Sequence, residues 1–355
     1  MAETLFSRPD RTRLRILLQT LAIGFFGAAL ATWAGLPAAP LVGASIAVSL
    51  AALSRQSVEI PVFLGNIAFT IIGCSLGSSI TRQSLAQSVQ WPISLIFLGL
   101  SVALIMWVCS WYLSRFYRLT PETAVLSTAP GTISYVLAFA ASGIGDIRSI
   151  LVIQNIRLVL VTTLLPFILD HLGLRATPLA PAVTGTIPGS LAVIIPALAI
   201  GFSIRRWHIP ASYLLVGMVC SGVAHYFDLV SGRPPSALIF FGFSITGSLV
   251  GTRFSAIPLA DLKRLLGASF GSVILAGLLA AACAYPSAVL LDIPFGQVFV
   301  AFAPGGVEAM AAMAIALGYD PAYVATHHLF RICLLFLFVP LSIKIARRGA
   351  SRRPG

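Results

Sequence analysis

Charged residues are scarce in this sequence of 355 residues. Asp, Glu, Lys and Arg make up only 10% of it, whereas a soluble domain carries about a quarter. Apolar residues make up 58%, and they fall into blocks of roughly 20, the length that crosses about 30 Å of hydrocarbon. The composition therefore excludes a water-soluble enzyme. It predicts an all-α polytopic membrane protein whose main partner is the lipid bilayer.

The sequence also lacks the short motifs of common catalytic and metal sites. It contains no GxSxG, Walker or HExxH pattern, and its five cysteines form no CxxC pair. Three of the five histidines, His171, His208 and His225, are scattered over different segments. We therefore expect no catalytic residue, no metal site and no cofactor, and we favour a protein that is not an enzyme.

The net charge of +12 invites a nucleic-acid interpretation. However, the Arg and Lys residues cluster at the chain ends and between apolar blocks, as at the cytoplasmic ends of membrane helices. The first apolar run, from Ile16 to about Gly35, is too long for a signal peptide. We expect a protein of the bacterial inner membrane, with both termini in the cytoplasm and no direct contact with nucleic acid.

The sequence aligns with itself at a single offset of 174 residues. The aligned residues include glycine, proline, aspartate and arginine, which chance similarity between apolar segments would not match. The matched pairs are Gly27/Gly201, Gly43/Gly217, Phe69/Phe243, Gly73/Gly247, Gly77/Gly251, Ala129-Pro130-Gly131/Ala303-Pro304-Gly305, Asp146/Asp320, Arg157/Arg331 and Pro166/Pro340. We therefore predict two membrane repeats, over 14–170 and 189–343, with a linker at 171–188 and a basic cytoplasmic tail at 344–355.

Each repeat contains six apolar segments. In the first repeat they cover roughly 14–35, 38–53, 60–80, 91–113, 123–143 and 149–170. In the second they cover roughly 189–205, 211–230, 236–251, 267–288, 296–317 and 322–343. Gly73-x-x-x-Gly77 and Gly247-x-x-x-Gly251 lie in the third segments and predict close helix packing.

The charges between segments indicate how the two repeats are oriented. If all twelve segments cross the membrane, 14 Arg and Lys residues lie inside and 7 outside. If the fifth segment of each repeat enters and returns, the second repeat is inverted and the counts become 18 and 3. The positive-inside rule thus favours inverted repeats, each with five spanning helices and one broken or re-entrant helix.

Both fifth segments contain a Pro-Gly pair that should break the helix, at Pro130-Gly131 and at Pro304-Gly305-Gly306. A break survives in a membrane only where protein or water satisfies the freed backbone groups. The half-helix that follows would direct free N–H groups inward, which favours an anion or a carbonyl oxygen. Matched broken helices are a strong sequence indication of a transporter site, although a structural kink without a ligand is the alternative.

Ionisable residues lie in the same segments. Glu308 follows the second break, with Ser134 at the matching position, and an intramembrane carboxylate is a functional candidate that suits proton coupling. Arg157 shares a helix face with Gln154, and Arg331 follows His327 and His328. Each arginine could bind an anionic solute, pair with Glu308, or hold backbone carbonyls at a helix end. The adjacent histidines favour proton relay or polar packing over a metal site.

The pattern APGGVEAM, then GYDP, then HHLFR resembles the AbrB-type duplicated membrane protein family, which is also labelled putative ammonia monooxygenase. The resemblance covers roughly 15–345. It implies a link to regulation of gene expression and, by one label, to ammonia oxidation. The residues show neither a copper ligand set nor a DNA-binding module, so any regulatory effect would be indirect.

We therefore predict a secondary transporter of a small, anionic solute, coupled to protons, whose site is lined by residues of both repeats. The predicted site residues are Pro130, Gly131, Ser134, Gln154, Arg157, Pro304, Gly305, Gly306, Glu308, His327, His328 and Arg331. A membrane sensor or regulator and a membrane-embedded, monooxygenase-like enzyme are the alternatives. The sequence leaves open whether the chain forms a homo-oligomer.

Overall fold

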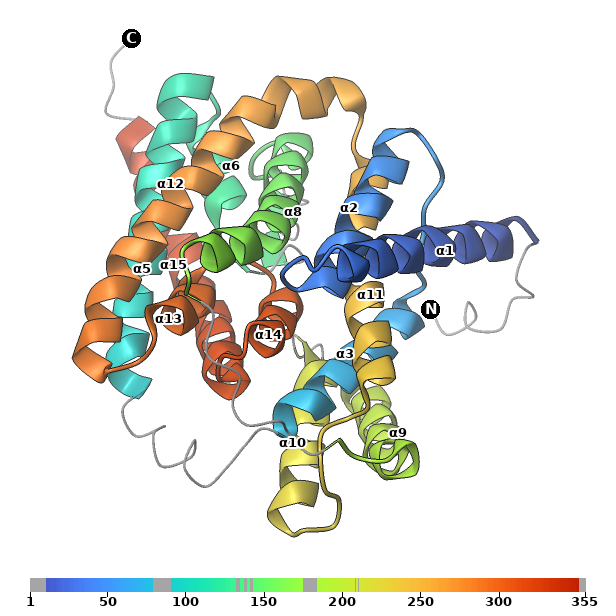
Figure 1. Cartoon of the computed structure of the whole chain (residues 1–355). Coiled ribbons are helices and arrows are strands. Elements are labelled where there is room, and N and C mark those ends of the chain that lie inside the picture. Colours follow the sequence, from blue (N-terminus) through green and yellow to red (C-terminus); the bar gives the residue numbers. More distant parts are fainter. Residues whose placement is uncertain are drawn as a thin grey trace.

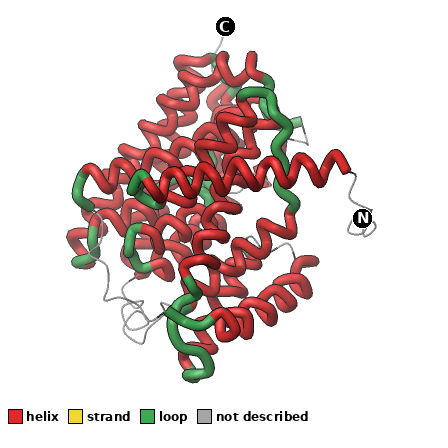
Figure 2. The backbone as a smooth tube through the Cα atoms, turned by 45° about the vertical axis from the view of Figure 1, so that its right-hand side comes forward, coloured by secondary structure: helices red, strands yellow, loops and turns green. Residues whose placement is uncertain are grey.

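The described part of the chain is helical almost throughout (Figures 1 and 2). The computed structural model describes residues 11–78, 91–131, 135–136, 139–140, 143–174, 184–207, 209 and 211–350. Within these residues there is no strand, only an isolated β-bridge between Thr184 and Arg233. The predicted class, an all-α polytopic membrane protein, is confirmed.

The helices follow the predicted apolar segments closely. Those of the first half are α1 (Arg11–Trp33), α2 (Ala39–Leu53), α3 (Val62–Gly77), α5 (Trp91–Tyr117), α6 (Pro121–Thr128) and α8 (Ile147–His171). Those of the second half are α9 (Ile187–Ile204), α10 (Ser212–Tyr226), α11 (Ser236–Thr252), α12 (Leu259–Leu291), α13 (Phe295–Phe302), α14 (Val307–Ala316) and α15 (Pro321–Ala350). Short 3₁₀ turns follow α9 and α11, at Arg205–Trp207 and Arg253–Ala256.

The helix bounds recur at the offset found in the sequence. Helices α6 and α13 have eight residues each, and both begin and end at matched positions. Helices α8 and α15 also begin at matched positions, directly after Asp146 and Asp320. Helix α15 runs to Ala350, so the first residues of the predicted tail continue the helix.

Seven helices or helix–turn units are long and apolar enough to cross a membrane, judged by length and composition over the described residues. They are Arg11–Trp33, Trp91–Tyr117, Ile147–His171, Ile187–Trp207, Ser236–Ser255, Leu259–Leu291 and Pro321–Arg347. Four shorter apolar helices, α2, α3, α10 and α14, lie among them. The chain is therefore a multi-pass membrane protein.

The helices sort into two bundles, and each bundle takes helices from both halves of the chain (Figure 1). In the first, α3 packs on α10, α2 packs on α11, and α1 and α9 flank these pairs. We call it the glycine bundle. In the second, α5, α6 and α8 pack with α12, α13 and α15. We call it the arginine bundle, because it contains Arg157 and Arg331. The two halves are interleaved rather than laid side by side.

The predicted glycines allow the close contacts of the glycine bundle. A Cβ atom added at Gly73 would meet the backbone of Leu214 on α10, and one at Gly247 would meet the backbone of Leu41 on α2. Each glycine of the two GxxxG pairs thus faces a helix from the other half. Small residues permit this approach, because van der Waals contact between backbones is a main source of helix association in lipid.

Helix α14 lies at the seam between the bundles. Its residues Met310 and Met313 belong to the large apolar cluster of the arginine bundle. Its residues Ala311 and Ala312 belong instead to a cluster with Leu41, Leu214 and other residues of the glycine bundle. The half-helix that follows the second break therefore contacts both bundles.

Candidate functional site

Both predicted breaks are present, and a buried arginine holds each of them. At the first break α6 ends at Thr128, and the guanidinium of Arg157 donates to three successive carbonyls. Its Nη1 lies 3.3 Å from Ser127 O and 3.1 Å from Thr128 O, and its Nη2 lies 3.1 Å from Ala129 O. The carbonyls that the broken helix leaves free are satisfied in this way, as a membrane interior requires.

The second break has the same construction. Helix α13 ends at Phe302 and α14 begins at Val307. Arg331 donates from Nη1 to Ala303 O and from Nη2 to Gly305 O, both at 2.6 Å. Of the three roles open to the arginines, the structure thus shows them holding carbonyls at a helix end. The Nε atoms of both arginines are buried and have no hydrogen-bond partner among the described residues.

A second pair of matched side chains supports the same helices. The amide of Gln154 donates to Leu126 O at 2.7 Å, and His328 Nε2 lies 3.1 Å from Val300 O at the matching positions. His328 Nδ1 also lies 2.6 Å from Nη2 of Arg331. Glutamine and histidine thus occupy equivalent places and make equivalent bonds to the last turn before each break.

The two breaks lie close to each other in the interior. A Cβ added at Gly131 would lie 3.8 Å from Arg331 Nε and 3.1 Å from a methyl of Leu335 on α15. A Cβ added at Gly306 would lie 3.3 Å from a methyl of Leu158 on α8. Each break therefore packs against the final helix of the other half. A side chain at either glycine would crowd these leucine methyl groups.

Asp146 and Asp320 cap the helices that carry the arginines. Asp146 accepts from the backbone N–H groups of Arg148 and Ser149, and Asp320 accepts from those of Ala322 and Tyr323. Matched aspartates thus cap matched helices in the two halves.

The two caps differ in their electrostatics. The hydrogen bond from the Ser149 side chain holds the pKa of Asp146 below its usual value. Burial of Asp320 raises the pKa of that carboxyl instead. The two matched caps therefore respond differently to acid.

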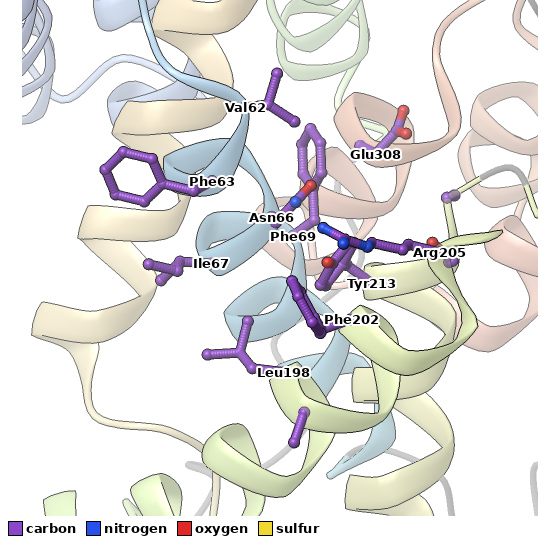
Figure 3. A pocket seen from close by; sticks show the side chains of 13 residues that line it. Val62, Phe63, Asn66, Ile67, Phe69, Leu198, Phe202, Arg205, Tyr213 and Glu308 are labelled. Atoms are coloured by element: carbon purple, nitrogen blue, oxygen red, sulfur yellow. The ribbon is translucent and has the colours of Figure 1, made fainter. Parts of the chain in front are cut away.

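A cavity of about 700 Å³ lies between the glycine bundle and the first turn of α14 (Figure 3). Glu308, in the first turn of α14, lines it from one side. Helices α3, α9 and α10 of the glycine bundle supply most of the rest. Their lining residues are Val62, Phe63, Asn66, Ile67, Phe69, Leu198, Ala199, Phe202, Ser212 and Tyr213, joined by Arg205 and Ala211 from the turns beside α9 and α10.

Charge and aromatic surface meet in this cavity. The guanidinium carbon of Arg205 lies 4.0 Å from the centre of the Phe202 ring, a cation–π contact. Figure 3 shows the Arg205 side chain reaching toward Asn66 and Tyr213. The cavity thus offers one cation, one carboxylate and several aromatic faces.

The structure distributes the predicted site residues over two places. Of these residues, only Glu308 lines the cavity. The side chains of Gln154, Arg157, His328 and Arg331 surround the breaks in the buried interior, and His327 lies beside them, facing α5. Ser134 lies outside the described residues.

Sequence patterns did not reveal the other cavity residues. In the sequence, Arg205 lies at the end of an apolar block, where an arginine indicates only which side of the membrane that end faces. Asn66, Phe202 and Tyr213 lie on separate helices with no shared spacing that could have drawn attention to them. They meet because α3, α9 and α10 pack against one another within the glycine bundle.

Comparison with known proteins identifies a family and two relatives of similar sequence. Residues 40–347 match the family described as AbrB, transition state regulatory protein. The chain is 24% identical to the putative regulator AbrB of Escherichia coli K12 over 354 residues, which is 96% of this chain and 97% of the relative. It is also 24% identical to the uncharacterized protein YhjN of Bacillus subtilis 168 over 293 residues, 76% of this chain and 75% of that protein. Since the family match covers most of the chain and spans both breaks, both arginines and Glu308, this protein is a member of the AbrB family.

Proposed function

We propose that this protein is a secondary transporter of a small organic anion, driven by protons, in the bacterial inner membrane. The observation that carries the proposal is the position of α14. It is the half-helix of a broken segment, it contacts both bundles, and its first turn presents Glu308 to the cavity that it forms with the glycine bundle. Matched discontinuous helices with a site at the interface of two repeats are typical of secondary transporters.

The chemistry of the cavity supports an organic anion with an apolar part. A volume of about 700 Å³ is suited to a small molecule. Arg205 would pair with an anionic group, and the rings of Phe69, Phe202 and Tyr213 would cover an apolar body. Glu308 would repel the anion when ionised and accept it when protonated. Binding of the anion and of a proton would thus be linked at one place.

The two-bundle arrangement supports alternating access. Each bundle is internally well packed, and α14 contacts both, so a shift of one bundle against the other would move Glu308 relative to the rest of the cavity lining and change the access to the cavity. The matched hydrogen bonds at both breaks support two repeats, and the charge distribution supports their inversion with both termini in the cytoplasm. Inverted repeats supply two related conformations of this kind.

The test does not require the solute to be identified in advance. Liposomes that contain the protein are given a ¹³C-labelled small-molecule extract of bacterial cells and an inward proton gradient. The compounds retained inside are then identified by mass spectrometry. We expect at least one organic anion to accumulate with the native protein and not with empty liposomes or the Glu308→Gln variant. If retention is the same in all three, the proposal is wrong.

A second candidate function is regulation of gene expression, favoured by the word regulatory in the family description and by the name of the Escherichia coli relative. In this case the protein would act indirectly, by changing a partner protein or the level of a metabolite. A regulator without transport would alter gene expression in cells while producing no accumulation in liposomes. A transporter whose cargo changes expression would show both effects.

A further inference from the structure

The adjacent histidines of α15 have different hydrogen-bond partners. His328 Nε2 faces the carbonyl of Val300 at 3.1 Å, so this nitrogen must carry a hydrogen. His328 Nδ1 faces Nη2 of Arg331 at 2.6 Å, and because arginine only donates, this nitrogen must accept. His328 is therefore held as one neutral tautomer. Gln154, at the matching position of the first half, makes the equivalent bond to Leu126 O, but its Oε1 has no partner among the described residues.

His327 is arranged to hold one more proton. Its Nδ1 lies 2.7 Å from the carbonyl of Tyr323 and therefore donates. Its Nε2 lies 2.7 Å from Oγ of Ser94 on α5, and that hydroxyl also lies 2.8 Å from Trp91 O. The hydroxyl has one hydrogen and faces two acceptors when the imidazole is neutral. When the imidazole is charged, Nε2 donates to Ser94, Ser94 donates to Trp91, and every contact is satisfied.

The surroundings of His327 contain few competing charges. The elements whose described side chains contact its ring are α5, with Trp91 and Ser94, and α13, with Phe302. None of these side chains is charged. On its own helix, the Tyr323 ring lies tilted by 33° against the imidazole, with 3.9 Å between ring centres. His328 and Arg331 are occupied by each other and by the second break.

The matching positions of the first half carry no such pair. The residues that correspond to His327 and Ser94 are Ile153 and Ala268, both apolar. The bonds that hold the two breaks recur in both halves, whereas the His327–Ser94 pair does not. A feature shared by the halves serves the common architecture, and a polar pair present in one half alone needs a separate reason.

We infer that His327, with Ser94 as its partner, is a proton-binding site of the transport cycle, and that His328 is a fixed neutral support for Arg331. The inference rests on the proposed function for its role in transport. Proton binding at His327 itself can be measured without any solute. A charged His327 would donate to Ser94 on α5 while its ring lies against Phe302, the last residue of α13 before the second break, so proton binding would be linked to the contacts at that break.

The experiment is solid-state NMR of the full-length protein in lipid bilayers, with ¹⁵N-labelled histidine, between pH 2.5 and pH 8. We expect one buried imidazole to convert from the neutral to the charged form on acidification. This conversion should be absent in His327→Gln and retained in His328→Gln, which copies the first half. The inference is overturned if the conversion disappears in His328→Gln and persists in His327→Gln. It is also overturned if the signal of His327, identified by its loss in His327→Gln, does not titrate in the native protein.

Two smaller substitutions on α5 test the same assignment with less risk of misfolding. Ser94→Ala removes the hydroxyl that accepts from the charged ring, so the midpoint of the conversion should move by about one pH unit toward acid. Ser101→Ala removes an equally buried hydroxyl from the same helix and should leave the midpoint in place. Equal midpoints in both variants would contradict the assigned partner.

The proposed transport function and the proposed proton site can be refuted independently. If His327 titrates but no anion accumulates in liposomes, the proposed function is wrong and the proton site remains. If accumulation depends on the proton gradient to the same degree in His327→Gln and in the native protein, the role of His327 in coupling is wrong and the transporter remains.

Discussion

Replacing Arg331 with methionine tests whether the guanidinium holds the second break together. Methionine keeps most of the length and apolar stem but leaves the carbonyls of Ala303 and Gly305 without their donors. An unpaired buried acceptor costs about 1–3 kcal/mol in soluble proteins, and hydrogen bonds in membranes average nearer ~0.6 kcal/mol. Loss of the charge removes a desolvation cost and offsets part of this. We therefore expect a net loss of about 2 kcal/mol.

The assay is thermal unfolding of the purified protein in detergent, followed by tryptophan fluorescence at one fixed heating rate. For a chain of 355 residues, a loss of about 2 kcal/mol corresponds to a fall in midpoint of roughly 3 °C. The control is Arg347→Met on the same helix, whose side chain pairs with Glu122 at 3.4 Å and is more than half exposed. An exposed pair contributes about 0–1 kcal/mol, so the midpoint should hardly move. Equal midpoints in the two variants would refute the assigned role of Arg331.

The packing, the caps and the topology each give a further prediction. Gly73→Val should prevent close packing in the glycine bundle and lower the unfolding midpoint strongly, whereas Gly277→Val, at a site with no atom within 4 Å, should be nearly neutral. Because the pKa of Asp146 is lowered, its ionised cap stabilises the fold above about pH 4, and this contribution is lost as pH falls through the folded pKa. The stability difference between the native protein and Asp146→Ala, measured by chemical unfolding, should therefore shrink on acidification. A difference that does not depend on pH would contradict this prediction. In a background without the native cysteines, an impermeant thiol reagent on intact cells should label Ala322→Cys and not Arg148→Cys, and labelling of both from outside would refute the inverted repeats.

Sequence reasoning was accurate for features that depend on neighbouring residues. An apolar block of sufficient length predicts a membrane helix, and a proline followed by glycine predicts that the helix is interrupted. The sequence therefore predicts the breaks at Pro130 and Pro304. The internal offset also identifies Arg157 and Arg331 as equivalent residues from the sequence alone. What these arginines hold could not be predicted, because three roles fit the same spacing and only the fold brings the carbonyls within reach.

The cavity was beyond the reach of sequence patterns. Arg205 lies at the end of α9, where a cation is expected at a membrane boundary for topological reasons alone. Its contact with Phe202 is local, since the two residues are three apart, but its place in one cavity with Glu308 depends on how α14 packs against the glycine bundle. Likewise, the spacing of His327 and His328 gave them a common interpretation, whereas their partners on α5 and α13 separate their roles.

The interleaving of the two halves also has a consequence for biosynthesis. Helices α2 and α3 leave the ribosome long before α10 and α11, which are their main packing partners. The same holds for α5, whose partner α12 begins only at Leu259. Until the second half has been synthesised, the surfaces of α2 and α3 that will pack on α11 and α10 are therefore exposed to lipid. Neither half, expressed alone, would contain a complete bundle, and two separately expressed fragments could assemble only by pairing with each other.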